Sequence, residues 1–168
     1  MKSSETHDRT SPELTDTLVL LRGWLMLVLI AGLLGTGVEL LLLKHTDGIW
    51  QLAPLVLIAV ALAVVAWCLV VRSRLSVRAL QGTMSLLVLS GVVGMIQHFR
   101  GNVAYERDSN PSLSGAELYR SAVQGSTPSL APGAMIQLGL IGLLIAFRHP
   151  GLARSKRDES PLETEIAS

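Results

Sequence analysis

The chain has 168 residues, of which 49% are hydrophobic and 16% charged, with a net charge of +1 and a mean hydropathy of +0.47. The length suits one domain, and the mean hydropathy is too high for an ordinary soluble domain. A net charge so close to zero argues against a nucleic-acid partner, and the single cysteine, Cys68, excludes an internal disulfide, CxxC thiol chemistry and a cysteine-rich metal site.

The chain opens with a polar segment, residues 1–17, which we expect to be cytoplasmic and helical near its end. Ser11 suits the N-cap of a helix, Pro12 its first position and Glu13 its positively polarised first turn. The apolar run that follows is too long for a cleavable signal, and no A-x-A-like site comes after it. The first helix is therefore predicted to begin in the cytoplasm and to continue into the membrane.

Four apolar blocks approach or exceed the roughly 18 residues that are typical of a membrane span. The block at residues 52–71 has no charge and no polar face, which excludes a soluble bundle of amphipathic helices. We predict an all-α integral membrane protein whose transmembrane domain, residues 18–148, is a four-helix bundle. The spans are residues 23–43, 52–71, 79–99 and 131–147, the last being the shortest.

The distribution of basic residues predicts the orientation. Arg72, Arg74 and Arg78 crowd the short link between spans two and three, and further Lys and Arg residues flank the first and fourth spans. Cytoplasmic loops carry this excess, so both termini are predicted to be cytoplasmic, in a bacterial inner (plasma) membrane. Aromatic residues fall near the predicted span ends, where they serve as interfacial anchors. They are Trp24, Trp67 and Phe147 at inner ends and Trp50, Phe99 and Tyr105 at outer ends.

The longest connection, residues 100–130, is predicted to lie outside the cell membrane as the outer loop. Ser114 and Glu117 match a capping box, which predicts a short amphipathic helix at residues 115–124. We expect this helix to lie over the outer ends of the bundle, with a plain solvated helix as the alternative. The charged tail, residues 149–168, is expected to be a disordered cytoplasmic segment.

Glu39 is a carboxylate inside the first apolar block. A charged side chain costs about 2.5–3.5 kcal/mol at a helix centre and less near the interface, so Glu39 requires a partner. Gly35 and Gly32 precede it at i−4 and i−7 on the same helical stripe, and small residues mark close helix packing in lipid. We therefore expect Glu39 to point into the bundle.

The third and fourth spans repeat this pattern. His98 follows Gly94 and Gly91 at i−4 and i−7, and Gln137 follows Gly133 at i−4. We expect Glu39, His98 and Gln137, called here the polar cluster, to converge near the outer leaflet, with His45 and Gln97 at a similar depth. The glycines predicted to pack helices together are Gly32, Gly35, Gly91, Gly94, Gly139 and Gly142.

The first functional hypothesis is a non-enzymatic accessory factor or subunit of a membrane complex. The polar cluster would then only hydrogen-bond across helices, which contributes well under about 1 kcal/mol per contact. The expected partners are the lipid bilayer and other membrane proteins, not nucleic acid. We predict no catalytic residue and no resident cofactor, and the sequence contains neither a P-loop nor an HExxH motif.

Two alternatives use the same residues differently. The polar cluster could serve a transporter or an ion- or metal-binding protein, because intramembrane ionisable groups are candidate functional sites. A haem-binding electron carrier would need His45 and His98 as axial ligands, since His7 and His149 are predicted on the cytoplasmic side.

Overall fold

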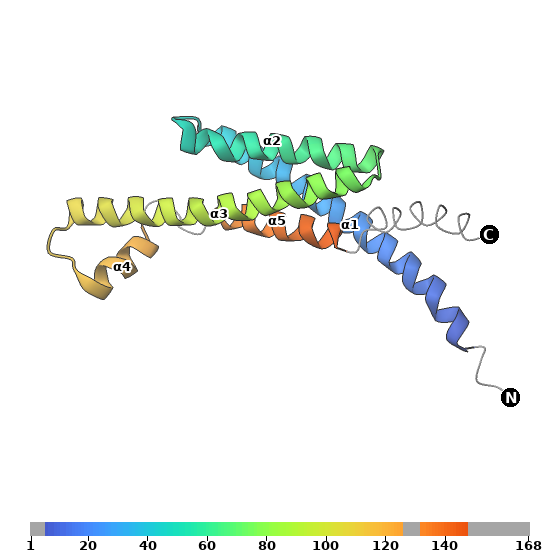
Figure 1. The fold of residues 1–168 in the computed structure, drawn as a ribbon. Coiled ribbons are helices and arrows are strands. Elements are labelled where there is room, and N and C mark those ends of the chain that lie inside the picture. The colour runs from blue at the N-terminus through green and yellow to red at the C-terminus, as the bar shows by residue number, and fades with distance from the viewer. Residues whose placement is uncertain (1–5, 126–131, 148–168) are drawn as a thin grey trace, which may run out of the picture.

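The computed structural model describes residues 6–125 and 132–147, and in these residues the protein is entirely helical (Figure 1). The predicted tail and part of the predicted outer loop, residues 126–131, lie outside the described residues. The helices are α1 (Thr6–Leu42), α2 (Ile49–Val70), α3 (Arg74–Ser109), α4 (Gly115–Val123) and α5 (Gly133–Ala146).

Three of these helices are long and apolar enough to cross a membrane: Asp16–Leu42 within α1, the whole of α2, and α3. The fourth predicted span corresponds to α5, which has only 14 residues. At about 1.5 Å per residue it is about 21 Å long, against a hydrocarbon core of about 30 Å. The described residues therefore contain three candidate spans and one shorter apolar helix.

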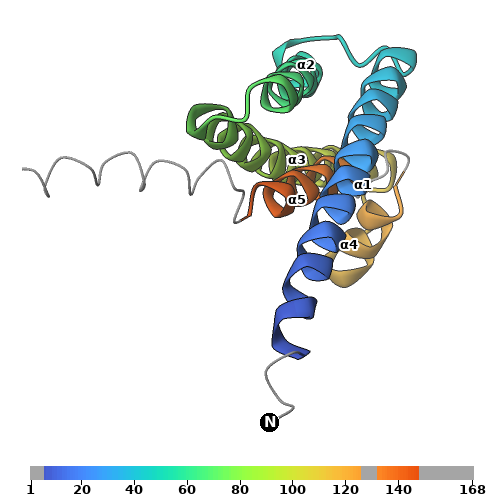
Figure 2. The ribbon, with the colours of Figure 1, turned by 90° about the vertical axis from the view of Figure 1, so that its right-hand side faces the viewer.

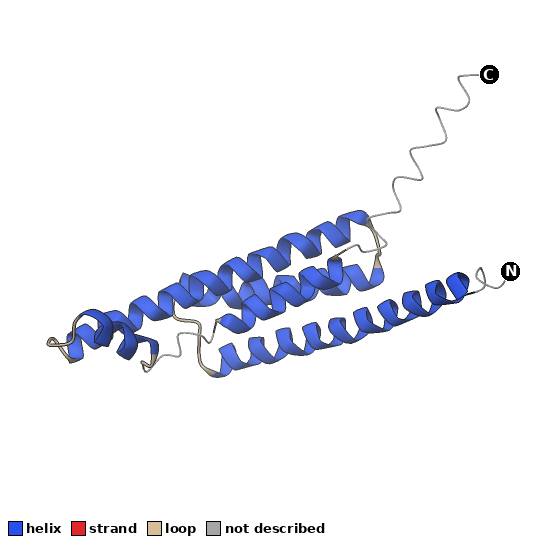
Figure 3. Cartoon of the chain, turned by 90° about the horizontal axis from the view of Figure 1, so that it is seen from below, coloured by secondary structure: helices blue, strands red, loops and turns tan. Residues whose placement is uncertain are grey.

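The four longer helices form a closed ring in which each packs against two others. α1 contacts α2 and α5. α3, which lies across the ring from α1, contacts the same two helices. Successive helices run in opposite directions, as in an up-and-down bundle (Figures 1 and 3). The bundle core is apolar and includes Leu29, Leu33, Val65, Leu80, Met84, Leu87 and Ile145, each at most 2% exposed.

α1 is inclined to the other three helices of the ring (Figure 2). It approaches α5 where Gly32 lies against Leu138, and it approaches α2 further along, where Gly37 lies against Ile58. Its contact face therefore changes along its length. We call the end of the bundle with residues 43–48 the turn end, and the opposite end, with residues 71–73, the link end.

The tightest packing joins α3 to α5 through glycines. A Cβ on Gly91 would lie 2.9 Å from the Pro132 carbonyl oxygen, and a Cβ on Gly139 would lie 2.7 Å from the Met84 carbonyl oxygen. Both neighbours are backbone atoms, so the two helices can approach this closely only because these positions lack a side chain.

Five of the six predicted packing glycines face another helix. Gly32 lies against Leu138, Gly94 against Pro132 and Gly142 against Met84, in addition to Gly91 and Gly139. Gly35 differs, because a Cβ there would meet nothing within 4 Å. Within this chain, the expectation of close packing at Gly35 is wrong, because Gly35 is about 60° around α1 from Gly32, the residue that meets α5.

The start of α1 and the capping of α4 differ from the sequence prediction. α1 begins at Thr6, ahead of the predicted N-cap Ser11. At α4 the helix itself is present, but the predicted capping box is not formed, since the Ser114 side chain makes no capping hydrogen bond. Gly115 has a φ of +55°, outside the right-handed helical region, so the first turn lacks the geometry that a capping box needs.

α3 is longer than the predicted third span. It passes Phe99 without a break and ends at Ser109, so the first part of the predicted outer loop is helical. Asn110 ends the helix, because the following Pro111 disfavours a helical conformation at that residue. We call residues 99–125, the end of α3 together with α4, the arm. It extends past the turn end of the bundle (Figure 1).

Candidate functional site

The residues of the predicted polar cluster differ in burial. Glu39, Gln137 and Gln97 are exposed, whereas His98 and His45 are half-buried. The expectation that Glu39 points into the bundle is therefore wrong for this chain.

The exposure of Glu39 has a physical cause. Glu39 lies seven residues beyond Gly32, on nearly the same face of α1, and Gly32 is the residue that meets α5. Because α5 runs antiparallel to α1, the level of Glu39 corresponds to a position seven residues before Leu138. That position precedes Gly133, where α5 begins. Among the described residues, the stripe that Gly32 and Glu39 share thus has a partner helix at Gly32 and none at Glu39.

His45 and His98 do come together. Their ring centroids lie 6.4 Å apart with an interplanar angle of 42°. His98 is on α3, and His45 lies in the turn between α1 and α2, where its backbone N–H donates to the Leu40 carbonyl at 2.9 Å. Lys44, with a φ of +51°, takes the left-handed conformation that ends α1 just before His45. This contact joins the turn after α1 to α3, the helix diagonally across the ring from α1.

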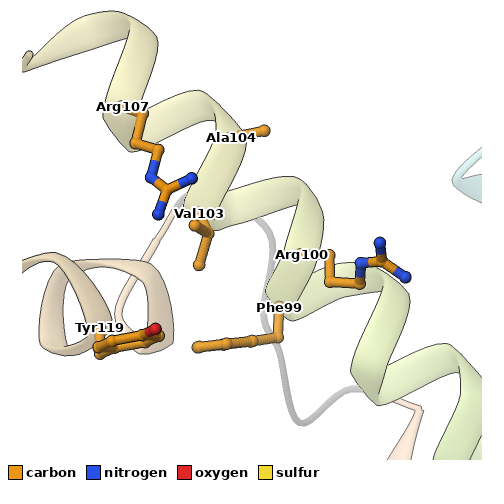
Figure 4. A pocket seen from close by; sticks show the side chains of 6 residues that line it. All are labelled: Phe99, Arg100, Val103, Ala104, Arg107 and Tyr119. Atoms are coloured by element: carbon orange, nitrogen blue, oxygen red, sulfur yellow. The ribbon is translucent and has the colours of Figure 1, made fainter.

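The arm has a groove that the sequence analysis did not predict (Figure 4). Its volume is about 260 Å³, and it lies between the end of α3 and α4. The rings of Phe99 and Tyr119 stack with centroids 6.1 Å apart and planes 8° apart. Arg107 lies above this stack in Figure 4, whereas the Arg100 side chain points away from it. We call this feature the arm groove, and its remaining lining residues are Val103 and Ala104.

A buried amide holds the arm together. Asn102 is 3% exposed, and its side-chain nitrogen donates to the Ala122 carbonyl at 2.9 Å. Leu118 and Ala122 are buried beside it, and a Cβ on Gly125 would lie 2.8 Å from the Asn102 Cγ atom. Because this contact joins the end of α4 to α3, it fixes the distance between the two walls of the arm groove.

A second groove lies between α1 and α2 and is wholly apolar. It has a volume of about 220 Å³ and includes Leu33, Gly37, Leu41, Leu55 and Ile58. Its character matches the surrounding surface, where large apolar side chains are exposed along both helices.

At the link end, a polar contact joins distant parts of the chain. The guanidinium of Arg22 on α1 donates to the carbonyl of Phe147 at 3.1 Å, just past the end of α5. The last carbonyls of a helix have no partner within it, and a cation there also complements the helix dipole. Arg22 thus supports the end of α5.

Comparison with known proteins adds nothing to what the fold shows about the class of protein. No family model, no curated protein and no solved structure matches the chain. Within residues 6–125 and 132–147, no group of three or more His, Cys, Asp or Glu side chains is arranged to hold a metal ion. The fold is that of an apolar helical protein with three helices that could span a membrane, compatible with a membrane protein.

Proposed function

We propose that the protein is a four-span integral membrane protein that acts as a non-enzymatic accessory subunit of a membrane complex. The observation that supports this role most directly is the apolar core of the bundle, built from Leu, Val, Met, Ile and glycine contacts. The side chains expected to line a polar site, Glu39 and Gln137, are exposed. A packed apolar bundle suits a structural role better than transport.

The proposal includes α5 as the fourth span despite its length. Its first residues lie at the level of Gly94, packed against α3. A bilayer can accommodate a helix of roughly 21 Å by local thinning, at a modest free-energy cost. The Arg22 contact at Phe147 satisfies a carbonyl at the other end, as the bilayer demands.

We further propose that the link end faces the cytoplasm of a bacterial inner membrane, with both termini inside. Support comes from Arg72, Arg74 and Arg78, which lie at or beside the link between α2 and α3. An excess of basic residues marks cytoplasmic loops. The arm, at the turn end, would then lie outside.

The arm is the part of the molecule that we propose contacts the partner protein. It combines an aromatic stack, Phe99 with Tyr119, and the arginine Arg107 around one groove. Aromatic residues and arginine dominate the binding energy of protein interfaces. A groove held in shape by Asn102 would also spare part of the ordering cost of association.

The test is purification of the tagged protein from its native membranes in a mild detergent. We expect a partner membrane protein at fixed stoichiometry with the wild type, and loss of at least about tenfold with Tyr119→Ala or Arg107→Ala, since hot-spot truncations cost about 2 kcal/mol or more. Tyr105→Ala is the matched control, because Tyr105 is exposed on the same stretch of α3 and does not line the arm groove. A wild-type protein that purifies alone would refute the accessory role, and equal recovery with all variants would refute the arm as the contact.

A further inference from the structure

The histidine pair, His45 and His98, is the place where two metal-ligating side chains from separate elements meet at the turn end. Both residues are half-buried, so each ring is partly held by its surroundings and partly open to a solute. The contact joins the turn between α1 and α2 to the base of the arm.

We propose that His45 and His98 bind one divalent transition-metal ion between their rings. A metal lies about 2.0–2.1 Å from an imidazole nitrogen, which places it about 3.2 Å from the ring centroid. Two rings on one metal then have centroids about 5 Å apart at a tetrahedral angle and about 6.4 Å apart when they lie opposite each other. The observed separation is 6.4 Å, at the upper end of this range, so the two rings are close enough to share one ion once a nitrogen of each turns toward it.

The donor set indicates which metals fit. Two neutral imidazoles suit Cu²⁺, Ni²⁺ and Zn²⁺, and among these Cu²⁺ binds a given nitrogen site most tightly. The remaining coordination positions go to water or to oxygen donors.

Metal binding would cross-link parts of the bundle that otherwise hold together through their neighbours. α1 and α3 lie diagonally across the ring, and each packs mainly on α2 and α5. An ion at the histidine pair would tie the turn after α1 directly to α3 where the arm begins. The site is independent of the accessory role, because none of the residues that line the arm groove is a ligand.

The experiment is a Cu²⁺ titration of the full chain, purified in detergent with an affinity tag that contains no histidine. We expect one high-affinity equivalent in the wild type and a loss of affinity of at least about tenfold with either His45→Ala or His98→Ala, since each removes one of two protein ligands. His149→Ala is the control for histidine content and should leave the affinity unchanged. Ni²⁺ and Zn²⁺ should bind more weakly than Cu²⁺.

Electron paramagnetic resonance of the Cu²⁺-loaded wild type provides a second readout that does not depend on how well a variant folds. Its spectrum should show coupling to two imidazole nitrogens, and each single variant should retain coupling to one. Wild-type protein whose copper shows one imidazole nitrogen or none would overturn the proposal. Unchanged affinity in the double variant His45→Ala/His98→Ala would overturn it as well.

Discussion

At the scale of single residues, the side chain with the clearest structural role is Asn102. Its polarity makes burial costly unless it is hydrogen-bonded, and the bond to the Ala122 carbonyl meets that cost in the interior of the arm. Removing the amide would leave the Ala122 carbonyl with one hydrogen bond fewer and open a cavity beside Gly125. The arm should depend on this one side chain more than on any exposed polar residue of the same segment.

Asn102→Ala should therefore loosen α4 from α3. Removing one partner of a buried hydrogen bond costs about 1–3 kcal/mol, so amides of residues 115–125 should exchange with solvent about 5- to 150-fold faster. Hydrogen exchange followed by mass spectrometry measures this directly. Asn110→Ala is the matched control, because Asn110 is exposed at the end of α3. Equal exchange in the two variants would show that the amide contributes nothing to the arm.

Single residues also mark the limit of prediction from the sequence. The period of a helix placed Gly32, Gly35 and Glu39 on related faces, but it says nothing about which helix lies opposite or where that helix begins. Glu39 is exposed because α5 starts below its level, a fact about a different segment of the chain. The meeting of His45 with His98 depends likewise on the left-handed Lys44 in the turn. Glycine spacing was more informative, because a small residue allows the backbone of a neighbouring helix to approach closely.

At the scale of elements, the pairing of α3 with α5 should be the most sensitive contact in the bundle. Gly139→Ala would bring a methyl group to 2.7 Å from the Met84 carbonyl oxygen and 3.0 Å from the Val88 nitrogen. Both are backbone atoms, so the helices must move apart rather than shift a side chain. Overpacking of this kind costs about 1–3 kcal/mol, which should appear as a lower free energy of unfolding in mixed detergent micelles.

Gly82→Ala is the matched control for that experiment, because it makes the same chemical change on α3 where a Cβ would meet nothing within 4 Å. Here only the helix propensity changes, and alanine should stabilise the helix by up to about 1 kcal/mol. The two substitutions should thus have opposite signs. Destabilisation by Gly82→Ala as large as that by Gly139→Ala would contradict a specific role for the α3–α5 contact.

Hydropathy predicted some helix boundaries well and others poorly. Hydropathy locates the apolar part of a helix, and it placed α2 close to its observed ends. It cannot detect that a helix continues after its apolar part ends, as α3 does beyond Phe99. Leu118, Ala122 and Asn102 stabilise that continuation by packing α4 against it, a tertiary effect that local sequence does not carry. The arm groove could not be predicted for the same reason.

At the scale of the whole molecule, the number of membrane crossings decides where the arm lies relative to the termini. Labelling of single cysteines with a membrane-impermeant maleimide tests this in a Cys68→Ala background, since Cys68 is the only native cysteine. With four spans, Ser114→Cys should react in intact cells. Arg72→Cys and Phe147→Cys should react only after the membrane is opened. All three positions are exposed, so protection would report the side of the membrane rather than burial in the protein.

Phe147 is the decisive position, because it follows directly after α5 and keeps its backbone carbonyl, the acceptor for Arg22, when its side chain is changed. If α5 crosses the membrane, Phe147 and Arg72 are on the same side. If α5 does not cross the membrane and lies on its outer side, Phe147→Cys should react in intact cells together with Ser114→Cys. That result would reduce the protein to three spans with its termini on opposite sides. Protection of Phe147→Cys would instead place the ends of α1 and α5 joined by Arg22 at the cytoplasmic face, leaving the arm as the part exposed outside the cell membrane.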